Sequence, residues 1–186
     1  MNPRFPKLAL DAMTPVQREV AAEITAGPRG EVRGPFIALL HNAALARRIQ
    51  QLGEHLRFHN KLPMATLEIA VLVTAREWDC QFEWFMHDKI ARKAGLAPQI
   101  IEAIAQGKEP PGMSADEALV HKASKQAHRS GRLDDDTFAA ARERFGLDGT
   151  LDLLALNGYY SMMAMVLNTA GMPLPENASP PLKSLS

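Results

Sequence analysis

The chain has 186 residues, and its 21 Lys and Arg residues balance its 21 Asp and Glu residues. This balance leaves no basic surface for nucleic acid and no acidic tail, so we expect no nucleic-acid partner. One cysteine excludes both an internal disulfide and a two-cysteine redox cycle within one chain. Hydrophobic residues make up 46% of the chain, enough for a sizeable core in a single domain.

The composition favours helices, because Ala and Leu are plentiful while aromatic residues make up only 6%. No apolar run reaches the length of about 18 residues that a membrane span needs, so we expect no membrane segment. Residues 1–10 contain two prolines and no long apolar stretch, which does not resemble a signal peptide. The sequence therefore predicts a cytoplasmic protein.

Capping signals and glycines divide the chain into about eight helices. Thr14-Pro-Val-Gln17 and Ser114-Ala-Asp-Glu117 have the form of capping boxes, and glycines stand where several of the helices should end. The expected helices cover residues 14–26, 43–58, 62–78, 79–94, 98–106, 114–130, 134–145 and 148–170, with a short helical turn at 36–40. We expect one helical domain over residues 1–170 and a Pro- and Ser-rich C-terminal arm over residues 171–186.

Glu68 is the only charged residue between Met64 and Ala75. A helix that is apolar on all sides is usually buried, and an unpaired buried carboxylate costs several kcal/mol. Glu68 should therefore have a partner, and His87 or Arg57 are the candidates. The pair is either a structural contact or a carboxylate and histidine tuned for proton transfer.

The following helix places Cys80, Glu83 and His87 on one face, at positions i, i+3 and i+7. With Asp79 as the N-cap, Cys80 would lie in the first turn, where the helix dipole favours a thiolate. This polar cluster is bordered by the small residues Ala91 and Ala94, so it leaves room for a small-molecule substrate or for a closely packed neighbouring helix.

A metal site is not expected. His55 and His59 stand four residues apart, which is a metal-ligand spacing, but no third ligand is evident. The loop over residues 27–35 contains three glycines and two arginines. It is either a cradle for an anionic substrate or a flexible connector.

The pattern Glu68-x11-Cys80-x2-Glu83-x3-His87 resembles that of the carboxymuconolactone decarboxylase superfamily, which includes the alkyl hydroperoxidase AhpD. The resemblance extends over most of residues 34–170 and is to the decarboxylase-like branch. It implies an all-α, AhpD-like helical domain whose subunits assemble through helix packing into trimers or hexamers. The flanking matches are Gly34-Pro-Phe36, Leu40-His41, Leu52-Gly53, Leu56-Arg57-Phe58, Ala94-Gly95 and Gly158-Tyr-Tyr160.

Glu83 stands where the AhpD pattern has its second cysteine, and a carboxylate cannot act as a resolving thiol. The resemblance therefore implies cofactor-free acid–base chemistry, with decarboxylation of a small carboxylated lactone or an intermediate of aromatic-compound catabolism. The implied catalytic residues are Glu68, Glu83, His87 and Cys80, and the implied substrate-binding residues are Arg57, Arg33, His41 and Tyr159.

Two alternatives remain open. One is an AhpD-like peroxidase in which Cys80 is oxidised to a sulfenic acid and then reduced by an external thiol. The other is a non-catalytic binding protein whose polar cluster only satisfies Glu68. The sequence also leaves open which of Glu68, Glu83 and His87 acts as the base.

Overall fold

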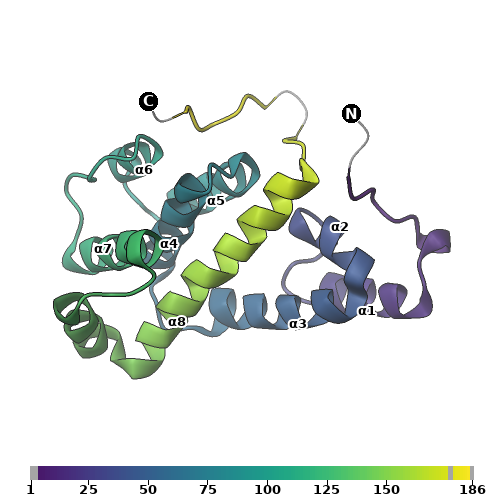
Figure 1. Ribbon diagram of the computed structural model, residues 1–186, viewed down its shortest axis with the longest axis horizontal. Coiled ribbons are helices and arrows are strands. Elements are labelled where there is room, and N and C mark those ends of the chain that lie inside the picture. The colour runs from purple at the N-terminus through teal and green to yellow at the C-terminus, as the bar shows by residue number, and fades with distance from the viewer. Residues whose placement is uncertain (1–3, 176–177, 185–186) are drawn as a thin grey trace. The chain divides into compact units, whose positions relative to one another are not determined.

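The computed structural model describes residues 4–175 and 178–184, and all the regular structure within them is helical (Figure 1). This confirms the predicted all-α class. Two 3₁₀ turns, Leu10–Ala12 and Leu40–Asn42, and a π-helical turn, His55–His59, accompany the α-helices. The α-helices are α1 (Pro15–Ala26), α2 (Pro35–Leu39), α3 (Ala43–Glu54), α4 (Met64–Glu77), α5 (Gln81–Lys93), α6 (Pro98–Ala105), α7 (Ala115–Ser130) and α8 (Asp135–Ala170).

The chain packs as two compact units. The first comprises Met1–His59 and Met165–Pro173, and the second comprises Asn60–Ala164 and Leu174–Ser186. Helix α8 therefore contributes most of its length to the second unit and its last turns to the first. The single-domain organisation over residues 1–170 stays a prediction. No helix in the described part of the chain is long and apolar enough to cross a membrane.

In the first unit, α1 begins as the sequence predicts. The Thr14 hydroxyl accepts a hydrogen bond from the Gln17 amide, and the Gln17 side chain accepts one from the Thr14 amide. Arg47 of α3 pairs with Glu19 and Glu23 of α1, which joins the two helices. The predicted helix over residues 43–58 is regular only to Glu54, because the following five residues form a π-helical turn.

The second unit is built around α4. Every residue from Thr66 to Arg76 is buried, and α5, α6 and α7 pack against this helix. The prediction that an almost wholly apolar helix lies in the core is therefore confirmed. Helix α7 begins at the predicted Ser114 capping box and ends at Gly131, which has a φ of 70°.

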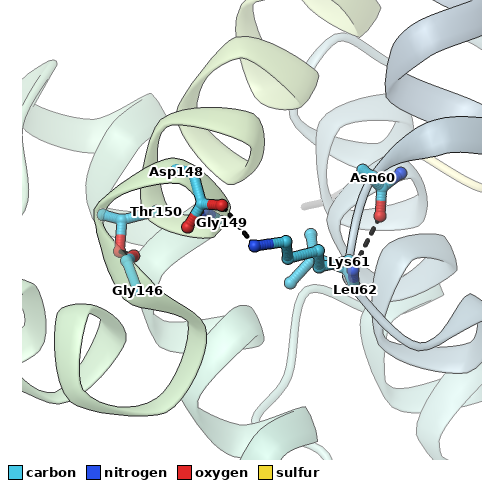
Figure 2. Close-up of polar contacts among 7 residues, drawn as sticks. All are labelled: Asn60, Lys61, Leu62, Gly146, Asp148, Gly149 and Thr150. Atoms are coloured by element: carbon cyan, nitrogen blue, oxygen red, sulfur yellow. Dashed lines mark hydrogen bonds and ion pairs between the residues drawn. The ribbon is translucent and has the colours of Figure 1, made fainter.

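Helix α8 is broken at Gly146, where the sequence predicts that one helix ends before another begins. Gly146 has φ 76° and ψ 175°, a conformation that a side chain would strain. Two local hydrogen bonds restart the helix: the Gly149 amide donates to Asp148 Oδ1 at 3.0 Å, and the Thr150 hydroxyl donates to the Gly146 carbonyl at 2.7 Å. Figure 2 shows this restart, with Lys61 Nζ lying 2.5 Å from Asp148 Oδ2.

The same close-up shows how the segment carrying Lys61 is shaped. The Asn60 side-chain oxygen accepts a hydrogen bond from the Leu62 amide at 2.7 Å, which folds the chain into a tight turn two residues before α4 (Figure 2). Both members of the Lys61–Asp148 pair are mostly exposed, so this contact contributes little to stability. The turn and the restart of α8 are thus shaped mainly by local hydrogen bonds.

The corner before α5 differs from the prediction by one residue. Cys80, and not Asp79, is the N-cap of α5, and Asp79 has a positive φ of 47°. The Cys80 amide donates a hydrogen bond to the Ala75 carbonyl at 2.8 Å, which closes the corner tightly behind α4. The prediction placed Cys80 within the first turn of the helix and was wrong. Asp79 adopts a left-handed conformation and still belongs to the turn after α4, so the helix begins one residue later than predicted.

Candidate active site

Glu68 and His87 form a buried pair between α4 and α5. Glu68 Oε2 lies 2.6 Å from His87 Nδ1, and the two residues are 0% and 4% exposed. The apolar surroundings of Glu68 predicted such a partner, and of the two candidates His87 is the one that meets it. An ionised carboxylate only accepts hydrogen bonds, so in the tautomer that matches this contact Nδ1 is the donor to Glu68, and Nε2 is the other ring nitrogen.

Glu83 lies on the other side of the imidazole. Its Oε2 is 3.4 Å from His87 Nε2, one helical turn earlier on α5, and the residue is 6% exposed. The single histidine therefore stands between two carboxylates, one at each ring nitrogen. Each ring nitrogen therefore has a carboxylate to which it can donate a hydrogen bond.

One oxygen of Glu68 is unusual. Oε1 is buried and has no hydrogen-bond partner in the described structure, whereas Oε2 holds His87. Burying a charged oxygen without a partner is costly, so the position suits a water molecule or a donor group on a ligand.

Two tyrosines of α8 form an aromatic wall beside His87. The Tyr160 ring meets the His87 ring edge-on, with 5.0 Å between centroids and an interplanar angle of 83°. Tyr159 packs against Tyr160 in the same manner at 5.3 Å, and both are almost fully buried. The sequence singled out Tyr159 and missed Tyr160. Only the Gly158-Tyr-Tyr160 match pointed to this position, and it did not distinguish the two rings.

Cys80, the N-cap of the same helix, lies in surroundings that disfavour its thiolate. It is fully buried, and its burial raises the pKa of the thiol to about 12, with the nearby Glu83 charge acting in the same direction. Backbone hydrogen bonds from the first turn of α5 act against this shift but do not offset it. The prediction that the helix N-terminus favours a Cys80 thiolate is wrong, because loss of solvent outweighs the helix dipole.

The other three predicted substrate-binding residues, Arg33, His41 and Arg57, lie in the first unit. Arg33 pairs with Glu31 at 3.2 Å, and both side chains are well exposed. The Arg57 guanidinium lies 5.4 Å from the centre of the Phe58 ring. His41 Nε2 lies 2.9 Å from the Pro6 carbonyl oxygen, and His41 also lines a cavity of about 420 Å³ in that unit. Their role in binding substrate stays a prediction.

Neither His55 nor His59 is part of a metal-ligand cluster among the described residues, where no three His, Cys, Asp or Glu side chains are placed to hold an ion. His59 Nε2 instead lies 4.0 Å from Glu54 Oε1.

Comparison with known proteins supports the resemblance seen in the sequence. Residues 43–125 match the family described as the Carboxymuconolactone decarboxylase family. This region includes Glu68, Cys80, Glu83 and His87. The search of curated proteins gave no match.

The fold is also that of a solved structure from Ralstonia eutropha JMP134, described as the alkylhydroperoxidase AhpD core of an uncharacterized peroxidase-related protein. The two share 18% sequence identity with a TM-score of 0.76, over 94% of this chain and 93% of the other. At this identity the likeness shows a common fold.

Proposed function

We propose that the chain belongs to the carboxymuconolactone decarboxylase/AhpD-like superfamily and is a cofactor-free acid–base enzyme. The family match over residues 43–125 and the AhpD-like fold support this assignment. Its reaction is the decarboxylation of a small carboxylated lactone or a related intermediate of aromatic-compound breakdown. One observation carries the proposal: a buried imidazole is held at Nδ1 by Glu68 at 2.6 Å and faces Glu83 at Nε2.

The chemistry needs one proton delivered at the right atom. Cleavage of the carbon–carboxylate bond releases CO₂ and leaves the bonding electron pair in the substrate as an enolate. The imidazolium of His87 donates its Nε2 proton to the enolate carbon and then recovers a proton from solvent. Glu68 fixes the tautomer and stabilises the imidazolium, while Glu83 orients Nε2 or passes the proton to it.

Substrate binding needs cationic and polar groups for the remaining carboxylate. Arg33, Arg57, His41 and Tyr159 are the proposed residues. Tyr159 packs beside Tyr160, which contacts His87, so this part of α8 is suited to bind the ring of the substrate.

The test is the release of CO₂ from carboxymuconolactone and related carboxylated lactones by the wild type, His87→Ala and Glu83→Gln. Loss of a positioned general acid typically costs about 10²- to 10⁴-fold, so His87→Ala should lower kcat/KM by at least about 10²-fold. Asp88→Asn is the matched control: this residue also lies on α5, but it pairs with Arg92 at the surface and should leave turnover unchanged. Unchanged turnover in both active-site variants would remove this mechanism.

A peroxidase is the second candidate, because the structural relative is described as peroxidase-related. Its nucleophile would be the Cys80 thiolate, which is scarce near neutral pH when burial raises the thiol pKa to about 12. We therefore expect peroxide consumption with an added dithiol to be slow, and to be the same in wild type and Cys80→Ser. Rapid consumption that disappears in Cys80→Ser would favour the peroxidase instead.

A further inference from the structure

The C-terminal residues 178–184 lie against the corner that joins α4 to α5. Leu182 is only 4% exposed although its neighbours in the arm are exposed. Its backbone forms two hydrogen bonds with one side chain: Gln81 Nε2 donates to the Leu182 carbonyl at 3.0 Å, and the Leu182 amide donates to Gln81 Oε1 at 2.9 Å. The side-chain amide of Gln81 thus pairs with the backbone of Leu182 through one donated and one accepted hydrogen bond, as the backbone of an adjacent β-strand would.

A second contact lies on the α4 side of the corner. Arg76 is 4% exposed, and its Nη1 donates to the carbonyl of Lys183 at 2.9 Å and to that of Ala105 at 3.2 Å. Its Nη2 pairs with Asp79, while its Nε is buried without a hydrogen-bond partner in the described structure. The arm therefore supplies one of the few acceptors of a buried cation, and such a cation is costly to leave unpaired.

The corner between these two contacts is strained. Asp79 has a φ of 47°, in the left-handed region that residues other than glycine adopt uncommonly. A conformation of this kind persists only where its surroundings hold it. Cys80 follows directly, and Glu83 lies in the first turn of the helix that begins there. The arm contacts Arg76 before the strained residue and Gln81 after it, so it spans the corner.

We propose that residues 178–184 act as a latch on the α4–α5 corner, which keeps Cys80 out of solvent and fixes the first turn of α5. Three groups hold the latch: the Leu182 side chain, the Gln81 amide and the Arg76 guanidinium. Because so few contacts hold it, the latch belongs to the least stable part of the second unit and opens without global unfolding. This inference does not depend on the proposed decarboxylation, because its effect is measured at a thiol.

Cys80 is the only cysteine of the chain and reports on the latch directly. The test is the rate at which iodoacetamide alkylates the full-length protein at pH 8, in wild type, Gln81→Ala and Leu182→Asp. Opening the corner admits the reagent and lets the thiol ionise near its ordinary pKa of about 8.5. We expect each variant to label roughly tenfold faster or more, since each loses at least one of the contacts that hold the latch. If Leu182→Asp does not fold, Gln81→Ala carries the test alone.

Two controls separate the latch from general loosening. Lys183→Ala removes an exposed side chain but keeps the backbone carbonyl that Arg76 binds, so its labelling rate should equal that of wild type. Ser114→Ala removes the N-cap of α7 and lowers stability in the same unit, but should leave Cys80 protected. Labelling of Gln81→Ala at the wild-type rate, or equal acceleration in Ser114→Ala, would overturn the proposal.

Discussion

Glu68 is the residue on which the proposed chemistry depends most. Glu68→Gln preserves the shape of the side chain, and its amide oxygen can still accept from His87 Nδ1, but it removes the charge that stabilises the imidazolium. We expect kcat to fall by about 10²-fold or more while the free energy of unfolding changes little. Steady-state kinetics and urea unfolding of the same samples check both parts. Equal activity of Glu68→Gln and wild type would leave Glu68 with a structural role only.

Cys80 should make the protein sensitive to alkali. Burial raises the pKa of the folded thiol to about 12, well above that of the unfolded chain, so the folded state retains a proton that the unfolded state releases. Its contribution to stability is therefore complete below pH of about 9 and is lost as the pH rises towards 12. Urea midpoints measured between pH 8 and pH 10.5 should fall more steeply for wild type than for Cys80→Ser, in which nothing titrates at this position. Parallel curves for the two proteins would contradict this assignment.

At the scale of elements, His128 joins α7 to α4 and α8. Its Nε2 lies 2.8 Å from Thr74 Oγ1, which is also near Asn157 Oδ1 at 3.3 Å. Thr74 can donate its one proton to the Ala70 carbonyl at 2.8 Å, in which case His128 is the donor to the hydroxyl. A neutral His128 imidazole satisfies this arrangement. Protonating the second ring nitrogen would place a positive charge in a half-buried site, which is unfavourable.

This network predicts a loss of stability in acid. Burial lowers the pKa of His128 in the folded state, so the unfolded chain binds a proton first as the pH falls below about 6.5. Stability should therefore decrease from pH 7 to pH 5, and less steeply in His128→Asn. His121, whose pKa burial also lowers, contributes to the same slope, so His121→Asn is the matched comparison. Thermal unfolding at several pH values measures the slopes; an unchanged slope in His128→Asn would contradict the role given to this network.

The break in α8 can be tested with two glycines of one helix. Gly146→Ala should destabilise by about 1–2 kcal/mol or more, because Gly146 has a φ of 76° and the new Cβ would lie 2.7 Å from Asp148 Oδ1. Gly158→Ala should instead stabilise by up to about 1 kcal/mol, since it lies inside the helix with nothing within 4 Å of the added carbon. Chemical denaturation of both variants measures the contrast. Similar effects of the two substitutions would show that the backbone at Gly146 is not constrained.

Local signals predicted most of these elements. Thr14 and Ser114 form the expected capping boxes, and Gly146 interrupts α8 where a helix end was expected. The corner at Asp79 was not predictable, because a left-handed residue other than glycine has no strong sequence signature. The docking of Leu182 was also missed: a single apolar residue in a Pro-rich arm does not indicate which distant surface it contacts.

The candidate site was predictable in part, and for a physical reason. A lone carboxylate in an apolar helix requires a partner, and His87 was one of the two candidates that the sequence offered. The contact between Tyr160 and His87 depends on how α8 packs beside α5, and periodicity within either helix carries no information about it. For the same reason the sequence could not show that Cys80 is sealed from solvent.

At the scale of the whole molecule, several large apolar side chains are exposed. Leu10, Leu147 and Leu151 are each at least 60% exposed. We propose that contacts with other subunits cover such side chains in the trimer or hexamer that the family resemblance implies. Sedimentation should therefore give a mass of three or six times the 20.4 kDa of one chain. A 20.4 kDa species at micromolar concentration would contradict the proposed assembly.

The complete burial of α4 limits how the site can change during evolution. Eleven consecutive residues, Thr66–Arg76, have no side that faces water, so a substitution there alters the packing of the whole unit before it alters recognition. New substrate preferences should therefore arise from replacements outside this helix, such as those beside Tyr159, while Glu68 is inherited unchanged. A collection of engineered enzymes with altered specificity should accordingly carry few of its substitutions in this segment.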